Sequence, residues 1–181
     1  MPSSCWPTCI QMIFFRHWIR VEQEQLSYDL WLVIEERTKP YYTLPFQVVP
    51  TWDPKHWLKL DRFEQDQIID VLGWFRFKPT VVYYSHLWNI ERLVMENLSK
   101  GIDIMINFQR AWISHNNITW WHLALVSSYD SDKRSITVCD PTTRAPNYRE
   151  VDIDELKEAM SEKRDKRERW IVIIEKITKD K

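Results

Sequence analysis

The stretch WHLALVSSYDSDKRSITVCD, residues 121–140, decides the fold class. Residues 119–129 contain several β-branched and aromatic side chains and predict a long strand. Residues 130–134 are polar and predict a turn, and residues 135–139 predict the returning strand. Two strands joined by a short turn pair in the antiparallel direction, so we expect an antiparallel sheet in the second half of the chain.

The hairpin also predicts a pair of interacting side chains. With the predicted turn, Tyr129 lies opposite Ser135 and Ala124 lies opposite Asp140. His122 then lies on the same face as Asp140, diagonally across the two strands. Diagonal neighbours are about 7–8 Å apart at the backbone, which allows an imidazole and a carboxylate to meet. We therefore predict His122 as a base and Asp140 as the group that orients it.

The first half of the chain is predicted to be helical. Residues 5–20 are apolar on almost every side and predict a buried helix, with Pro7 early enough for a first turn. Gly101 is expected to end a helix, and residues 102–108 to form a strand. A helical half followed by an antiparallel sheet predicts an α+β fold in a single domain, residues 1–181. The other predicted elements are helices at 22–37, 60–74, 86–100 and 152–161, strands at 80–84 and 170–177, and an ordered loop at 39–57.

Composition and charge argue against several classes of partner. The 181 residues include 25 basic and 26 acidic residues, a net charge of -1, so no strong field draws the chain to nucleic acid or to an anionic membrane. The apolar runs are too short to span a membrane, and the N-terminus lacks a basic segment followed by an apolar one. We therefore expect a cytoplasmic protein with no nucleic-acid and no membrane partner, and the oligomeric state is left open. Because the chain has only 2 Gly, we expect Asn, Asp or Ser at left-handed backbone positions.

Three cysteines are too few and too scattered for a disulfide framework, which favours a reducing compartment. Cys5 stands where a helix begins, and there the helix dipole and the unpaired backbone N–H groups favour a thiolate. Cys5 is therefore the candidate nucleophile, whereas Cys9 and Cys139 are expected to pack inside. No spacing of ligands supports a metal site. The remaining histidines are expected to be structural: His17, His56, His86 and His115.

Local motifs resemble one family. Residues 5–12, Cys-Trp-Pro-Thr-Cys-Ile-Gln-Met, resemble the Cys-Gly-Pro-Thr-Cys-Leu-x-Met signature of the double-glycine (bacteriocin leader) peptidase-like group of papain-like cysteine peptidases. Residues 122–130 are similar to its His-x-x-x-Val-x-Gly-Tyr-Asp motif, and residues 138–141 resemble its Asp-Pro segment. Residues 101–108 look like the strand before its catalytic His. Residues 21–100 carry no motif of this family.

This resemblance implies a papain-like fold, in which a buried N-terminal helix packs against a C-terminal antiparallel sheet. It also implies a catalytic triad of Cys5, His122 and Asp140, with no cofactor and no metal. In such a site His122 takes the proton from Cys5, the thiolate attacks a peptide or isopeptide carbonyl, and water or an amine resolves the thioester. The implied substrate is a peptide or a protein.

Two positions depart from the family pattern. Trp6 stands where the family has Gly, which puts a bulky side chain beside the thiol. The family resembles papain in using a Gln a few residues before the Cys as an oxyanion donor, and residues 1–4 contain no Gln. Loss of one such donor typically costs about a hundredfold to a thousandfold in rate. The missing Gln therefore leaves two interpretations open, an active peptidase with another oxyanion donor and a site with weak or no activity.

Two alternative functions follow from these observations. A phytochelatin-synthase-like transpeptidase would keep the triad and change the acceptor, and residues 140–160 are loosely similar to those enzymes. A catalytically inactive papain-like domain would instead bind a peptide or protein partner in the cleft that holds the substrate in active papain-like enzymes. Trp6 and the missing Gln favour this second alternative.

Overall fold

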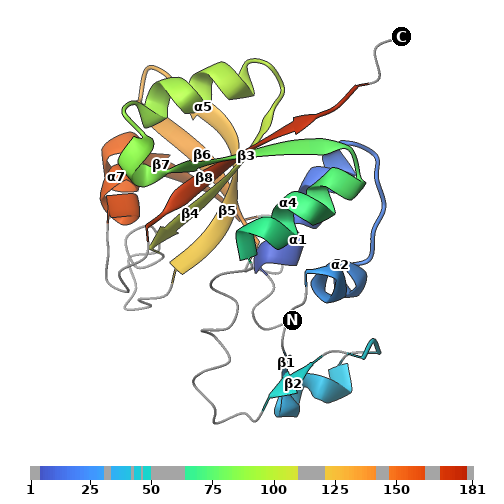
Figure 1. Ribbon diagram of the computed structural model, residues 1–181. Coiled ribbons are helices and arrows are strands. Elements are labelled where there is room, and N and C mark those ends of the chain that lie inside the picture. Colours follow the sequence, from blue (N-terminus) through green and yellow to red (C-terminus); the bar gives the residue numbers. More distant parts are fainter. Residues whose placement is uncertain are drawn as a thin grey trace. The chain divides into compact units, whose positions relative to one another are not determined.

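The computed structural model shows two compact units, Met1–Phe77 and Lys78–Lys181 (Figure 1). We describe each unit by itself, and the expectation of a single domain stays a prediction. The predicted α+β class is confirmed, because the chain combines helices with a six-stranded sheet. The structure describes residues 5–30, 34–41, 43–45, 47–49, 64–109, 121–141, 147–161 and 168–178.

The first unit begins with the predicted buried helix, α1 (Cys5–Arg16). Cys9, Ile10, Ile13 and Phe14 are fully buried, whereas Phe15 is 53% exposed. The helix ends four residues earlier than predicted. Trp18 adopts a left-handed φ of 62°, and the N–H of Ile19 donates to the carbonyl of Phe14 at 2.9 Å, which closes the helix end.

The left-handed positions differ from the prediction. Besides Gly101, the described residues with positive φ are Trp18, Arg76 and Arg134. None of these three is the Asn, Asp or Ser that the composition predicted. The predicted role of Gly101 is confirmed, because its φ is 71° and its N–H donates at 2.9 Å to the carbonyl of Leu98, the last residue of helix α5 (Ile90–Leu98).

The predicted helix at 22–37 is wrong in its second part. Helix α2 (Gln23–Asp29) ends early, and a short strand, β1 (Ile34–Glu35), and a 3₁₀ helix, η1 (Glu36–Tyr41), follow. Ile34 is drawn into a two-stranded parallel sheet with β2 (Val48–Val49), and this pairing excludes a helix there. The unit also contains α4 (Glu64–Trp74), as predicted for those residues. Residues 50–63, which include part of the predicted loop, lie outside the described residues.

The six-stranded sheet has the order β3-β8-β4-β5-β6-β7 (Figure 1). The pairs β8–β4, β4–β5, β5–β6 and β6–β7 are antiparallel. The sequence predicted five of these strands and missed β7. The bounds are β3 (Phe77–Tyr83), β4 (Asp103–Gln109), β5 (Trp121–Asp130), β6 (Ser135–Asp140), β7 (Asn147–Asp152) and β8 (Trp170–Lys176).

Helices α5 and α7 (Ile153–Ser161) pack against this sheet, and a short 3₁₀ helix, η2 (Tyr84–His86), follows β3. Every residue of β4 is buried, as expected for a strand in the middle of a sheet. The core between the helices and the sheet contains apolar side chains from both. They include Ile90, Val94, Leu156 and Met160 from the helices and Ile106, Phe108, Ala124, Val126, Ile136 and Val138 from the strands.

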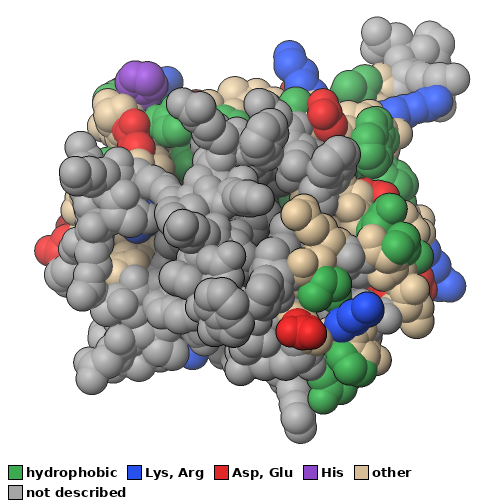
Figure 2. All heavy atoms as spheres, turned by 60° about the horizontal axis from the view of Figure 1, so that its bottom comes forward, with side chains coloured by type: hydrophobic (Ala, Val, Ile, Leu, Met, Phe, Trp, Pro, Cys, Tyr) green, Lys and Arg blue, Asp and Glu red, His purple; other side chains and the backbone are tan. Residues whose placement is uncertain are grey.

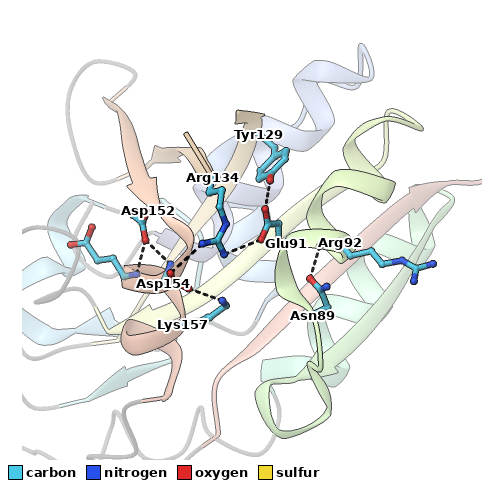
Figure 3. A network of polar contacts seen from close by, with 9 residues as sticks. Asn89, Glu91, Arg92, Tyr129, Arg134, Asp152, Asp154 and Lys157 are labelled. Atoms are coloured by element: carbon cyan, nitrogen blue, oxygen red, sulfur yellow. Dashed lines mark hydrogen bonds and ion pairs between the residues drawn. The ribbon is translucent and has the colours of Figure 1, made fainter. Parts of the chain in front are cut away.

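A network of polar contacts joins the β5–β6 hairpin to α5 and α7 (Figure 3). The Tyr129 hydroxyl and the Arg134 guanidinium both donate to the Glu91 carboxylate, the latter at 3.2 Å. Arg134 also lies 3.5 Å from Asp154, which accepts a hydrogen bond from Lys157 at 2.7 Å. The side chain of the turn residue Arg134 therefore holds the hairpin to both helices.

We predict that Glu91→Gln lowers the melting temperature by a few degrees at neutral pH. The Tyr129 and Arg134 hydrogen bonds hold the pKa of Glu91 below its ordinary value of 4.5. A lowered pKa in the folded state stabilises the fold above pH 4.5 and loses this effect as the pH falls through the lowered value. The difference from wild type should therefore shrink in acid. A thermal melt series against pH tests this, with Glu158→Gln on the exposed side of α7 as the control. A difference that stays constant down to acid pH would contradict the prediction.

Candidate active site

Cys5 is the first residue of α1, so its thiol lies at the positive end of the helix dipole, as predicted. Cys5 is partly buried, whereas Cys9 and Cys139 are buried. Trp6 is only 8% exposed, so most of its indole packs inside the protein. Pro7 lies in the first helical turn, where its missing N–H costs no helical hydrogen bond. This surface of α1 therefore offers one partly accessible thiol with a favourable local dipole.

Two hydrogen bonds tie the start of α1 to the segment that follows it. The Gln23 amide donates to the hydroxyl of Thr8, one turn after Cys5 on the same helix. The Gln11 amide donates to the carbonyl of Val21 at 2.8 Å. Thr8 and Gln11 both belong to the motif of residues 5–12, so these motif residues fix the first helix against the chain that leads into α2.

His122 and Asp140 form the pair that the hairpin predicted. His122 Nε2 lies 2.8 Å from Asp140 Oδ1, and both residues are nearly fully buried, with 4% and 6% exposure. A carboxylate accepts, so Nε2–H is the donor and the neutral ring carries its lone pair on Nδ1. The remaining nitrogen, Nδ1, is the one that can take a proton from another group.

The register that creates this pair differs from the prediction. Asp130 pairs with Ser135 and Tyr129 with Ile136, one residue away from the predicted pairing at the turn. A β-bulge between Val126 and Ser128 then shifts the register, so that Leu125 pairs with Cys139. Continued by one residue, this register places Asp140 opposite Ala124, as the sequence predicted.

The bulge has a clear consequence for the site. If the register at the turn ran on unchanged, Asp140 would lie opposite Leu125, whose side chain is on the other face from His122. The extra residue, Ser127, stays at the surface, and its hydroxyl donates to the Thr137 carbonyl at 3.1 Å. Because of the bulge, the hairpin can have the observed turn and still place His122 and Asp140 on the same face of the sheet.

Phe108 completes the surroundings of the imidazole. It pairs with His122 across β4 and β5, and the two rings meet edge to face at 5.7 Å between centroids. Phe108 is 2% exposed, so its ring shields one side of the pair from water. Trp120 and Trp121 directly precede His122 in the sequence and could either shield the His122–Asp140 bond or pack in the strand. Trp120 and the side chain of Trp121 lie outside the described residues. Phe108 had no sequence signal, because its contact depends on the β4–β5 register.

The other candidate residues do not form a second site in the described part of the chain. Burial raises the pKa of the Cys139 thiol, and the nearby Asp140 charge raises it further. His17 and His86 contact aromatic rings, of Phe77 and Tyr83 respectively. His56 and His115 lie outside the described residues. Among the residues that the structure describes, no group of three His, Cys, Asp or Glu side chains could hold a metal ion.

Charged side chains of both signs are mixed with hydrophobic ones on the part of the face in Figure 2 that the structure describes. Across the described residues, no helix is long and apolar enough to cross a membrane. The predicted absence of nucleic-acid partners stays a prediction.

No protein-family model matches the chain, and a search of curated proteins gives no significant match. The resemblance of the three motifs to papain-like peptidases therefore rests on the residues themselves. Cys5 belongs to the first unit, and His122 and Asp140 belong to the second. The pairing of Cys5 with His122 stays a prediction.

We predict that Cys5 reacts with iodoacetamide about tenfold faster than Cys9 or Cys139 at neutral pH. Cys5 combines partial exposure with a helix N-terminus, whereas Cys9 is buried and Cys139 is buried with a raised pKa. Peptide mapping by mass spectrometry after short labelling times measures the three rates. Faster labelling of Cys9 or Cys139 than of Cys5 would contradict the assignment of the nucleophile.

Proposed function

We propose that the protein is a papain-like cysteine peptidase or a related thiol acyl-transfer enzyme that acts on a peptide or isopeptide bond. The observation that carries the proposal is the buried hydrogen bond between His122 and Asp140. A histidine held by a carboxylate through one nitrogen is the arrangement that prepares the other nitrogen as a general base. The position of Cys5 at the start of α1 supports the same proposal.

In the proposed reaction, His122 Nδ1 takes the proton from Cys5, and the thiolate attacks the carbonyl carbon of the substrate. Asp140 keeps the proton on Nε2 and stabilises the imidazolium that forms. The imidazolium then protonates the leaving amine, which leaves a thioester on Cys5. Water or a second amine attacks the thioester, with His122 as the base, and restores the thiol. Water gives a peptidase, whereas an amine acceptor gives a transpeptidase.

The second candidate function is a papain-like domain that binds a peptide or protein partner without turnover. The substitution of Trp6 at the family's Gly position favours it. The burial of Trp6 limits this argument, because most of the indole lies inside the protein and does not stand at the surface. The two candidates differ in one property that can be measured, which is whether Cys5 becomes acylated.

We expect wild-type protein mixed with p-nitrophenyl acetate to release a burst of p-nitrophenolate, followed by slower steady release. The burst corresponds to acetylation of Cys5, and the steady phase to hydrolysis of the thioester. Intact-mass spectrometry should find the acetyl group in wild type and not in Cys5→Ala. Equal release by wild type, Cys5→Ala and His122→Gln would refute the proposed enzyme activity. The second candidate, a domain that binds without turnover, would then remain.

We also predict that Asp140→Asn slows alkylation of Cys5 about tenfold at neutral pH while the fold is kept. Loss of the carboxylate removes the charge that stabilises the imidazolium, so His122 supports the Cys5 thiolate less well. Asp132→Asn, at an exposed position in the hairpin turn, is the matched control and should react like wild type. Iodoacetamide rates and melting temperatures are measured for all three proteins. Equal rates with equal melting temperatures would mean that Asp140 is only a structural residue.

A further inference from the structure

The first unit contains a cavity of about 430 Å³ that the proposed chemistry does not use. We call it the η1–β2 pocket, because its lining comes from β1, η1, β2 and the segment between η1 and β2. Its apolar lining is formed by Ile34, Pro40, Leu44, Pro45 and Val48. Ile34 is 4% exposed and gives the pocket one buried apolar residue, whereas Pro40, Pro45 and Val48 are exposed, so the pocket is open to solvent. A cavity of this size and character accommodates one apolar side chain or a small apolar ligand.

One positive charge stands at the pocket. Lys39, on η1, is an exposed lining residue. Within the described part of the chain Lys39 makes no ion pair, although Glu36 is exposed on the same helix. An ammonium beside an apolar cavity favours a ligand with one negative charge next to an apolar group. The chemistry of the pocket therefore fits a carboxylate attached to an apolar residue.

Hydrogen bonds to α2 hold one part of the pocket lining. The Glu24 carboxylate of α2 accepts hydrogen bonds from the backbone N–H groups of Thr43 and Leu44 and from the Thr43 hydroxyl, the last at 2.9 Å. These bonds hold the segment that carries two of the lining residues. Lining residues that are already held in place lower the entropy cost of binding.

The neighbouring strands favour a peptide over a fatty acid. Ile34 and Val48 line the pocket and are also paired with each other in the two-stranded β1–β2 sheet. Among the described residues, β1 and β2 are two residues long and pair only with each other. An extended peptide can pair with the second edge of such a strand through its backbone donors and acceptors. A fatty acid has no backbone groups for this pairing.

We propose that the η1–β2 pocket binds the C-terminal end of an extended peptide whose last residue is apolar. The last side chain enters the apolar cavity, and the terminal carboxylate pairs with the Lys39 ammonium. This inference does not rest on the proposed function, since it uses neither Cys5 nor His122.

The test uses the full chain with Cys5→Ala, so that no turnover disturbs the binding measurement. The probe is an Ala-Ala-Ala-Leu peptide labelled with fluorescein at its N-terminus, and fluorescence anisotropy measures its binding. We expect saturable binding of the free acid and about tenfold weaker binding of the same peptide with a C-terminal amide. Lys39→Gln should weaken the acid by the same factor and leave the amide unchanged. Lys78→Gln, at an exposed position on β3, is the matched control and should bind the acid as the parent does.

Three results would overturn the proposal. The first is no saturable binding of the free acid by the folded protein, and the second is equal binding of acid and amide. The comparison of acid and amide uses one unaltered protein, so a folding defect in a variant cannot produce it. The third is octanoate displacing the peptide at concentrations equal to those of the unlabelled peptide, because this would assign the pocket to a simple fatty acid. Val48→Asp, which places a negative charge on a partly exposed lining residue, should abolish binding of the acid.

Discussion

The register of β5 against β6 is the constraint on which the candidate site depends. At the hairpin turn Asp130 pairs with Ser135, and this register alone would place Asp140 and His122 on opposite faces of the sheet. The bulge adds one residue to β5 and brings the two side chains to the same face, where they form a buried hydrogen bond. The apolar core holds the shifted register, because Ala124 and Val126 would leave the core if the strand moved by one residue.

Most of the elements could be predicted from the sequence, because their hydrophobic patterns are strong. The apolar surface of α1 and the β-branched and aromatic residues of β5 and β6 gave the correct elements. Strand β7 was missed because it has a weak pattern, with Val151 buried while Tyr148 and Glu150 are exposed. The helix predicted at 22–37 failed after Asp29, because Ile34 pairs with a strand that is distant in the sequence. Local propensity cannot report such a long-range pairing.

The candidate site divides in the same way. The shared face of His122 and Asp140 was predicted by counting residues around the turn, but the assumed turn was one residue too long and the bulge was not foreseen. The shorter turn and the bulge each shift the β5–β6 register by one residue in opposite directions, so Asp140 still lies opposite Ala124. Phe108 could not be predicted, since its contact with His122 depends on how β4 and β5 align. The same holds for Gln23, whose bond to Thr8 joins two helices. The distance between the Cys5 thiol and the His122 ring depends on both units. Counting residues along the strands of one unit cannot predict it.

The proposed pairing of Cys5 with His122 is tested most directly by chemical cross-linking of the two residues with 1,3-dibromoacetone. One bromomethyl carbon alkylates a thiolate, and the other then alkylates an imidazole nitrogen only if it lies within about 5 Å, the reach of a three-carbon bridge. Because the Nε2–H of His122 donates to Asp140, Nδ1 is the ring nitrogen that we expect to be alkylated. We predict that digestion and mass spectrometry find the Cys5 and His122 peptides joined, and that His122→Gln abolishes this product. Alkylation of Cys5 with no link to His122, or a link to another histidine, would contradict the proposed pairing.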